Sequence, residues 1–159
     1  MQDLREASFL TPLDAVLNEA VSFLQAESLM LMTTADLQSI LALGFLESAL
    51  LDQDISYSRR ILPPNSHLPP DEDGLIPEQN GSKIFFVDPW DRVESSSENV
   101  FVLSPRAIEV EFHQSPTKRR GRVDVVLQSS AIASSLAPNG GRTKRCRPYS
   151  GCGQWLMES

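Results

Sequence analysis

Hydrophobic residues form short unbroken runs at several places in the chain, without the alternation that marks a strand exposed on one face. Runs of this kind are typical of strands buried on both faces, as in parallel sheets. The pattern predicts strands at 28–34, 83–88 and 99–103, and the segment 55–62, which stops at Pro63-Pro64, is expected to form a further strand.

Two longer segments repeat apolar residues every three or four positions, which predicts helices that pack against a core. The first covers 12–26, and Thr11 is placed as its N-cap. The second covers 35–51, is apolar nearly all round, and is expected to be capped by Thr33 or Thr34. Strands and helices alternate here, so the expected fold is α/β, with a mainly parallel sheet and helices on both faces.

The pattern is weaker in the second half of the chain. Alternation over 108–113 predicts a half-exposed edge strand, and the basic run 118–122 is expected to form a turn. A further strand is predicted at 123–127 and a short helix at 129–136. The segment 63–81 holds five of the eleven prolines, shows no periodicity, and is therefore expected to be a mobile loop.

Length and composition agree with a single domain spanning 1–159. The chain has 159 residues, of which 41% are hydrophobic and 22% are charged, enough apolar material for one core. An apolar element begins at 154–159, which predicts that the chain is the N-terminal part of a longer protein. Cys146 and Cys152 are too few for a disulfide framework, so we interpret them as reduced thiols of a cytoplasmic protein.

No apolar run reaches the roughly 18–20 residues that span a bilayer, and the N-terminus lacks the pattern of a secretory signal, so no membrane partner is expected. The net charge of −7 is unevenly distributed: residues 1–117 carry 6 basic and 19 acidic side chains, and residues 118–159 carry 8 basic and 2 acidic ones. The basic quarter 118–159 predicts contact with acidic groups of the same fold, with an acidic protein partner, or weakly with nucleic acid. Its basic side chains are Lys118, Arg119, Arg120, Arg122, Arg142, Lys144, Arg145 and Arg147.

Candidate chemistry lies where the predicted parallel strands end. Ligands of open α/β sheets bind in the crevice at the carboxyl ends of the strands. Thr33, Thr34 and Ser104 are expected to line this crevice, and Asp36 and Asp88 would supply two carboxylates there. Two carboxylates are candidate metal ligands, but each also has a structural interpretation, Asp36 at a helix N-terminus and Asp88 at a turn.

Two segments of this region resemble a known family. A buried strand leads into Thr34-Ala35-Asp36-Leu37 and a long apolar helix, and a later strand ends in Asp88. This order is similar to the N-terminal domain of the DHH-type phosphoesterases, the superfamily of RecJ exonucleases, inorganic pyrophosphatases and Cdc45-like proteins. In that family the first turn reads Asp-x-Asp-Gly and the fourth strand ends in Asp-His-His. Here threonine and leucine replace two turn residues, and Leu103-Ser104-Pro105 replaces the triplet.

The resemblance implies a degenerate domain that has lost its metal ligands, contains no cofactor, and acts as a protein-interaction scaffold in DNA replication or repair. Two alternatives stay open. One is an active metal-dependent phosphoesterase or nucleotide-binding enzyme that uses Mn²⁺ or Mg²⁺ on Asp36 and Asp88. The other is a nucleic-acid-binding module that uses the basic quarter 118–159.

Overall fold

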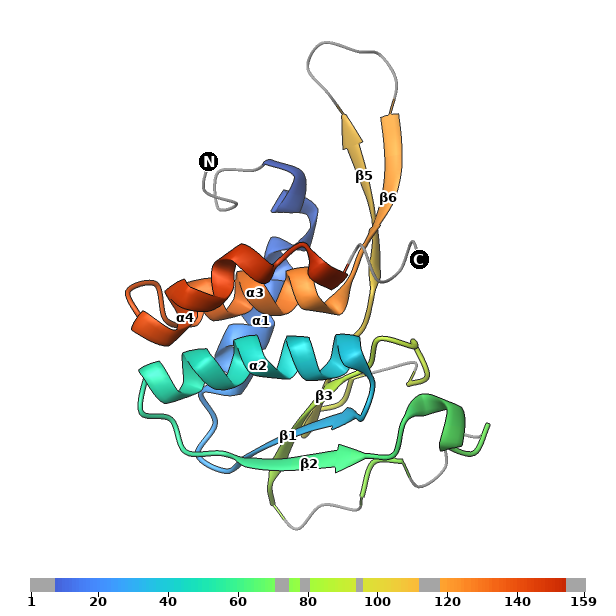
Figure 1. Cartoon of the computed structure of the whole chain (residues 1–159), viewed down its shortest axis with the longest axis vertical. Coiled ribbons are helices and arrows are strands. Elements are labelled where there is room, and N and C mark those ends of the chain that lie inside the picture. The colour runs from blue at the N-terminus through green and yellow to red at the C-terminus, as the bar shows by residue number, and fades with distance from the viewer. Residues whose placement is uncertain (1–7, 71–74, 78–80, 94–95, 112–117, 154–159) are drawn as a thin grey trace.

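The computed structural model describes residues 8–70, 75–77, 81–93, 96–111 and 118–153. Helices lie over one larger sheet, and a two-stranded hairpin projects beyond them (Figure 1). The elements in chain order are η1 (Ser8–Leu13), α1 (Asp14–Leu24), β1 (Leu29–Thr34), α2 (Leu37–Asp52), β2 (Ser58–Leu62), η2 (Asn65–His67), β3 (Lys83–Val87), β4 (Val100–Leu103), β5 (Arg106–Glu111), β6 (Lys118–Val123), α3 (Val125–Leu136), α4 (Gly141–Cys146) and η3 (Arg147–Tyr149).

The larger sheet has four parallel strands in the order β2-β1-β3-β4. Each of these strands falls inside a segment predicted as a strand, so the predicted α/β class with a mainly parallel sheet is confirmed. The central strands β1 and β3 are buried on both faces, which is why their sequences are continuously apolar. The edge strand β2 is largely exposed and carries two arginines.

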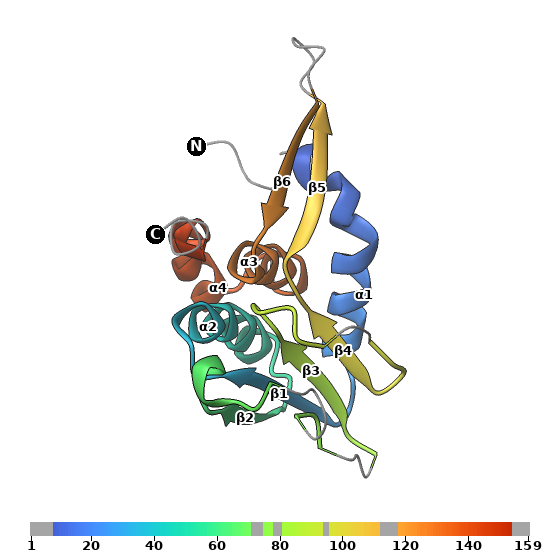
Figure 2. The ribbon, with the colours of Figure 1, turned by 90° about the vertical axis from the view of Figure 1, so that its right-hand side faces the viewer.

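The helices that contact this sheet in the described part of the chain all lie on one face (Figure 2). Leu31, Phe85 and Phe101 are register partners on that face and share a core with α1 and α2, while α3 packs on these two helices. The predicted placement of helices on both faces is therefore wrong. The described residues of the proline-rich 63–81 connection, which crosses from β2 to β3, contain only the short 3-10 helix η2 and therefore place no longer helix on the other face.

Loop residues cover the opposite face of the sheet. Met32, Phe86 and Val102 form a second apolar cluster there, packed against Ile76 and Val93 from the loops. The expected mobility of 63–81 stays a prediction, and its acidic run at 71–73 lies outside the described residues.

Three local predictions near the N-terminus and β1 need correction. The first helix begins at Asp14 rather than at residue 12, and Leu13 instead of Thr11 occupies the N-cap position. The second helix begins at Leu37, with Asp36 at its N-cap position in an extended conformation. Neither threonine caps this helix, because Asp36 already occupies the position where the backbone turns into it.

The basic run 118–122 forms strand β6 rather than a turn, and it pairs antiparallel with β5. The register places Glu109 opposite Arg120 and Glu111 opposite Lys118. Opposite charges on facing positions stabilise such a pair, so a sequence without apolar alternation is held as a strand by its neighbour. Only the first part of the predicted edge strand 108–113 is described, as part of β5.

Of the predicted strand at 123–127, only Val123 is in a strand, as the last residue of β6, and Val125 begins α3, which extends the short helix predicted at 129–136. The Asp124 carboxylate caps this helix by accepting hydrogen bonds from the backbone N–H groups of Val126 and Leu127 at 2.8 and 2.9 Å. The predicted apolar element at 154–159 lies outside the described residues. No helix in the described part of the chain has the length and apolar character needed to cross a membrane.

Candidate functional site at the carboxyl edge of the sheet

The carboxyl edge of the parallel sheet brings together the predicted strand-end residues. Thr33 is in register with Val87, and Val87 with Leu103, so β1, β3 and β4 end at the same level. The backbone N–H of Asp88 donates to the carbonyl of Leu103 at 2.8 Å, which continues the pairing one residue past the strand. Asp36, Asp88 and Ser104 therefore all follow strands that end at one edge, as predicted.

Asp36 accepts three hydrogen bonds on a single carboxylate oxygen. The donors to its Oδ2 are the hydroxyl of Thr34 at 2.6 Å, the backbone N–H of Asn65 at 3.0 Å and the indole N–H of Trp90 at 3.1 Å. Burial raises the pKa of Asp36, but the three hydrogen bonds outweigh burial and hold this pKa below its ordinary value. The carboxylate thus joins β1 to the loops that follow β2 and β3.

Asp88 has a different environment. Asp88 is only 1% exposed, and its Oδ2 accepts hydrogen bonds from the backbone N–H groups of Arg92 and Val93 at 2.6 and 2.9 Å. Burial raises the pKa of this carboxyl, and the backbone hydrogen bonds only partly offset that effect. Asp88 therefore closes the turn that follows β3, which agrees with its structural interpretation.

Arg92 connects the two aspartate environments. Its guanidinium donates to the side-chain oxygen of Asn65 at 2.7 Å and also to the carbonyl of Pro69. Asn65 in turn donates its backbone N–H to Asp36, and Arg92 donates its own to Asp88. Oδ2 of Asp36 and Oδ2 of Asp88 are thereby linked through Asn65 and Arg92.

The crevice residues also bond within the protein. The hydroxyl of Thr33 donates to the carbonyl of Val87 at 2.9 Å, and the hydroxyl of Thr34 donates to Asp36. The carbonyl of Ser104 accepts the side-chain amide of Gln128, which is fully buried. Among the described residues, no three His, Cys, Asp or Glu side chains come together as a group that could hold a metal ion.

Sequence reasoning missed the residues that complete this site, namely Asn65, Trp90 and Arg92. Asn65 lies in the proline-rich segment, and Trp90 and Arg92 follow Asp88 in a turn with no apolar pattern. The contacts of Asp36 join positions 29 and 54 residues apart, and no local pattern encodes such pairings. The only available signal was that Asp-Pro-Trp-Asp directly follows a predicted strand end.

The first half of the basic quarter is engaged by acidic residues of the hairpin and of the turn after β3. Arg122 forms an ion pair with Asp91 at 3.3 Å, and the register places Glu109 opposite Arg120. Lys118 is the register partner of Glu111 in the same ladder, and the side chains of Glu111 and Arg119 lie outside what the structure describes. Arg122 is therefore paired with an acid from the first 117 residues, and Arg120 lies opposite another one in the ladder.

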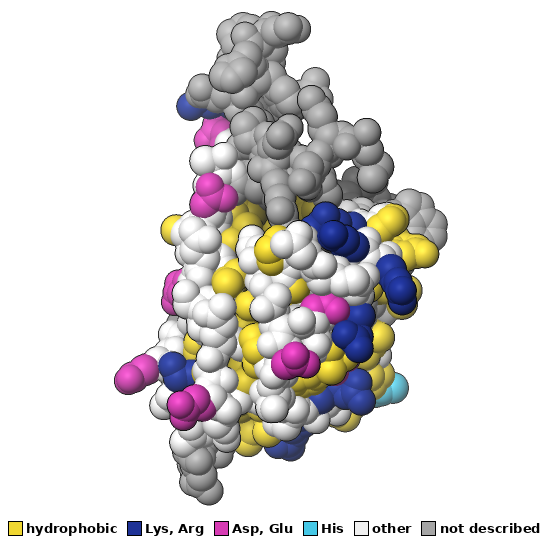
Figure 3. All heavy atoms as spheres, turned by 90° about the vertical axis from the view of Figure 1, so that its left-hand side faces the viewer, with side chains coloured by type: hydrophobic (Ala, Val, Ile, Leu, Met, Phe, Trp, Pro, Cys, Tyr) yellow, Lys and Arg dark blue, Asp and Glu magenta, His cyan; other side chains and the backbone are white. Residues whose placement is uncertain are grey.

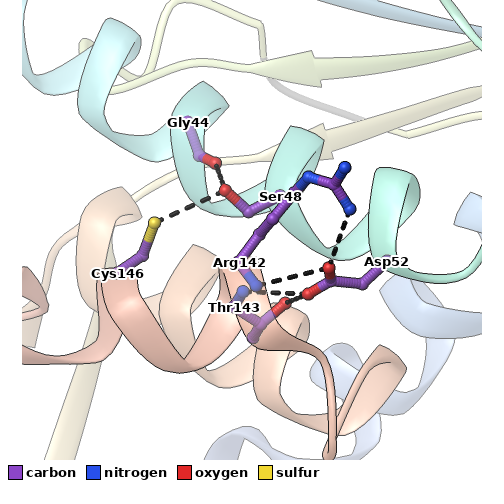
Figure 4. A network of polar contacts seen from close by, with 6 residues as sticks. All are labelled: Gly44, Ser48, Asp52, Arg142, Thr143 and Cys146. Carbon is purple, nitrogen blue, oxygen red and sulfur yellow. Dashed lines mark hydrogen bonds and ion pairs between the residues drawn. The ribbon is translucent and has the colours of Figure 1, made fainter.

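The second half of the basic quarter is held by one carboxylate at the end of α2. Asp52 accepts the backbone N–H and the hydroxyl of Thr143, both at 2.9 Å, and it also accepts the backbone N–H and guanidinium of Arg142 (Figure 4). Burial raises the pKa of Asp52, but these four hydrogen bonds outweigh burial and lower it. The close approach requires Gly140, because a Cβ there would lie 2.0 Å from Oδ2 of Asp52.

The remaining cations of this half differ in their partners. Arg147 donates to the hydroxyl of Ser134 and the carbonyl of Pro138, both at 3.3 Å. Lys144 and Arg145 are exposed, with no ion-pair partner in the described part of the chain. In one side view, Lys and Arg side chains gather with apolar ones along the right-hand margin, while Asp and Glu lie towards the centre and left (Figure 3).

Comparison with protein-family models, with curated proteins and with solved structures found no match for this chain. The fold and the site define a mainly parallel α/β domain whose strand-end aspartates are bonded to its own loops.

Proposed function

We propose that this chain is a protein-interaction domain without phosphoesterase activity, of the scaffold kind that its resemblance to the DHH superfamily implies for DNA replication or repair. A cytoplasmic location is part of the proposal, because the two cysteines are free thiols, as is usual in a reducing compartment. The observation that carries the proposal is the state of Asp36 and Asp88 at the carboxyl edge.

Both aspartates already serve the protein's own backbone and side chains. Oδ2 of Asp36 has three donors, and Oδ2 of Asp88 holds two backbone N–H groups of a tight turn. A hard divalent cation needs about six oxygen ligands, and a cation on Oδ2 of either aspartate would compete with the donors that this oxygen already accepts. This supports a structural role for both residues over a metal-dependent reaction.

An exposed apolar surface supports the interaction role. The largest exposed hydrophobic side chains include Leu37 and Ile40 on α2 and Ile61 on β2, which are 60%, 42% and 43% exposed. Leu37 and Ile40 lie one turn apart on α2, and Ile61 is on the face of the sheet that α2 covers. Apolar residues grouped on a surface in this way are typical of contacts with other proteins.

A metal titration tests the proposal against the enzyme alternative. Thermal unfolding is followed with increasing Mn²⁺ or Mg²⁺, and hydrolysis of a dinucleotide and of single-stranded DNA is measured in parallel. We expect no hydrolysis and no stabilisation, whereas a specific site would add about 2.7 kcal/mol at a hundredfold excess over its Kd. Metal-dependent hydrolysis that is lost in Asp88→Asn and kept in the neighbouring Asp91→Asn overturns the proposal.

A salt titration of DNA binding tests the nucleic-acid alternative. Because acids of the same fold face much of the basic quarter, we expect weak binding that disappears near physiological salt. Micromolar affinity at physiological salt, abolished when Arg119 and Arg120 are replaced by alanine, would show a nucleic-acid-binding module instead.

A further inference from the structure

The outer edge of β2 has unpaired backbone groups in the described part of the chain. The carbonyl of Leu62 accepts the backbone N–H of Ala35 just past β1, so the polar backbone groups of Leu62 face the sheet. Alternate residues of a strand direct these groups to opposite sides, which places those of Arg59 and Ile61 on the open side. No described residue pairs with them.

The opposite edge of the same sheet is closed by the chain itself. The backbone N–H of Val102 in β4 donates to the hydroxyl of Ser96 at 2.9 Å. Ser97 and Val100 exchange backbone hydrogen bonds at 2.8 and 3.3 Å, which occupies the next outward position of β4. The open edge of β2 is therefore a specific property of that strand.

An apolar surface adjoins the open edge on the helix-bearing face. Ile61 is in register with Thr33, and Arg59 with Leu31, so both side chains lie on the face that α2 covers. Arg59 contacts Glu47 of α2 at 3.2 Å. α2 runs antiparallel to β2 (Figure 1). Ile61, two residues after Arg59 on β2, therefore lies nearer the N-terminal turns of α2, where Leu37 and Ile40 are exposed.

The charges at this edge restrict what can pair with it. Arg60 is in register with Met32, so its side chain lies on the face opposite α2, where it is exposed and has no described ion-pair partner. Antiparallel pairing of β2 with a second copy of itself, centred on Arg60, would place the two Arg60 side chains opposite each other, and facing like charges destabilise a ladder. An acidic strand would instead neutralise Arg60.

We propose that β2 binds an extended segment of a partner protein in which acidic and apolar residues alternate, so that the segment becomes a fifth strand of the sheet. Its backbone pairs with Arg59 and Ile61, its apolar side chains contact Leu37 and Ile40, and its acidic side chains face Arg60. This inference rests on the proposed interaction function and names the chemistry of the partner.

Synthetic peptides of about ten residues, near the upper length of common strands, test this inference. Three fluorescent peptides alternate glutamate with valine, leucine or phenylalanine, and binding is measured by anisotropy against the full chain. A matched control peptide keeps the side chains but has alternate backbone amides N-methylated, which removes its ladder donors. We expect at least one alternating peptide to bind and its N-methylated form to fail.

Variants of β2 locate the binding on the edge. Ile61→Pro removes an outward N–H at a position where a strand tolerates proline, and it should weaken peptide binding about tenfold or more while the protein stays folded by circular dichroism. Arg60→Glu should weaken binding of the glutamate peptides and favour peptides that alternate lysine instead. Lys144→Glu makes the same charge change on α4 and should leave both affinities unaltered.

Several outcomes overturn the inference. These are no binding by any of the three peptides at about 1 mM, the weak limit of specific affinity, or equal binding by Ile61→Pro. A concentration-dependent dimer that Ile61→Pro abolishes shows that a second copy fills the edge, and it overturns the inference as well. Peptide failure in a protein that hydrolyses nothing leaves the proposed function standing, whereas metal-dependent hydrolysis removes that function whatever the peptides do.

Discussion

The two edges of the parallel sheet have opposite characters. On the β4 side, Phe101, Val102 and Leu103 are buried, and Ser96 and Ser97 occupy the outward backbone groups. On the β2 side, four of the five residues are exposed and the outward backbone groups have no partner in the described chain. Two strands of one sheet thus differ in nearly every property except their parallel pairing.

The difference shows two ways in which a sheet edge is protected, one by covering it and one by leaving it exposed but charged. Unpaired strand edges invite pairing with other chains, and proteins protect them with loops, charges or short strands. β4 is protected by its own preceding loop, and β2 by the charges of Arg59 and Arg60, which repel copies of the same strand. Arginine side chains on an edge disfavour pairing with basic strands and favour pairing with acidic ones, whereas a covering loop blocks pairing with any strand.

Truncation of one apolar side chain on each edge strand should give the largest contrast in stability. Phe101 is 3% exposed and its ring stacks on Phe85 at 5.0 Å between centroids, so Phe101→Ala should lower the free energy of unfolding by about 3–5 kcal/mol. Ile61→Ala should cost only about 0.5–1 kcal/mol, since the side chain is half-exposed. Urea denaturation measures both, and equal losses would contradict the contrast.

Proline substitution probes the backbone of the same two strands. Val102→Pro removes an N–H that donates to Ser96, and it should cost at least about 2–3 kcal/mol because the hydrogen bond is lost and the hydroxyl is left unpaired. Ile61→Pro should cost below about 1 kcal/mol, because edge strands tolerate proline where the N–H faces outward. A severe loss in Ile61→Pro would mean that this N–H is not free.

The sequence predicted β1, β3 and β4 well because strands that are buried on both faces have unbroken apolar sequences. It failed at β6, whose sequence Lys-Arg-Arg-Gly-Arg-Val has no strand pattern and depends on pairing with β5. It also failed at the start of α3, where Val125 and Val126 favour a strand and the Asp124 cap decides for a helix.

The candidate site was predictable only in its position. That Asp36 and Asp88 lie at the carboxyl edge followed from the order of strands and helices. Their partners did not, because Asn65, Trp90 and Arg92 reach them from loops whose path depends on the whole fold. The open edge of β2 could not be predicted either, because the sequence does not give the order of the strands in the sheet.

Asp52 tests whether the open side of the sheet depends on the basic quarter. It joins α4 to the end of α2, the helix whose Glu47 forms an ion pair with Arg59 of β2. Asp52→Ala should lower the free energy of unfolding by about 0.5–2 kcal/mol, as the loss of a helix cap does. Glu19→Ala, an exposed acid on α1, is the matched control and should change little. Peptide binding that survives in Asp52→Ala would show that β2 acts independently of α4.

The smallest predicted effect is a difference in how the two strand-end aspartates make the free energy of unfolding depend on pH. The pKa of Asp36 is lowered in the fold, so its contribution is present above the ordinary value of 3.8 and is lost as pH falls through the folded pKa. The pKa of Asp88 is raised, so its contribution is present below 3.8 and is lost as pH rises through the folded pKa.

Asparagine variants of the two aspartates should show this difference. Their loss of unfolding free energy relative to the wild type should change with pH in opposite directions. Relative to the wild type, Asp36→Asn should be most destabilising near neutral pH and should approach the wild type in acid. Asp88→Asn should instead be most destabilising in acid, because ionised Asp88 is the costly form in the buried turn. Urea unfolding at several values between about pH 3 and pH 7 measures both differences. Slopes of the same sign would mean that folding shifts the pKa values of both carboxyls in the same direction, which would contradict the difference between the two aspartates.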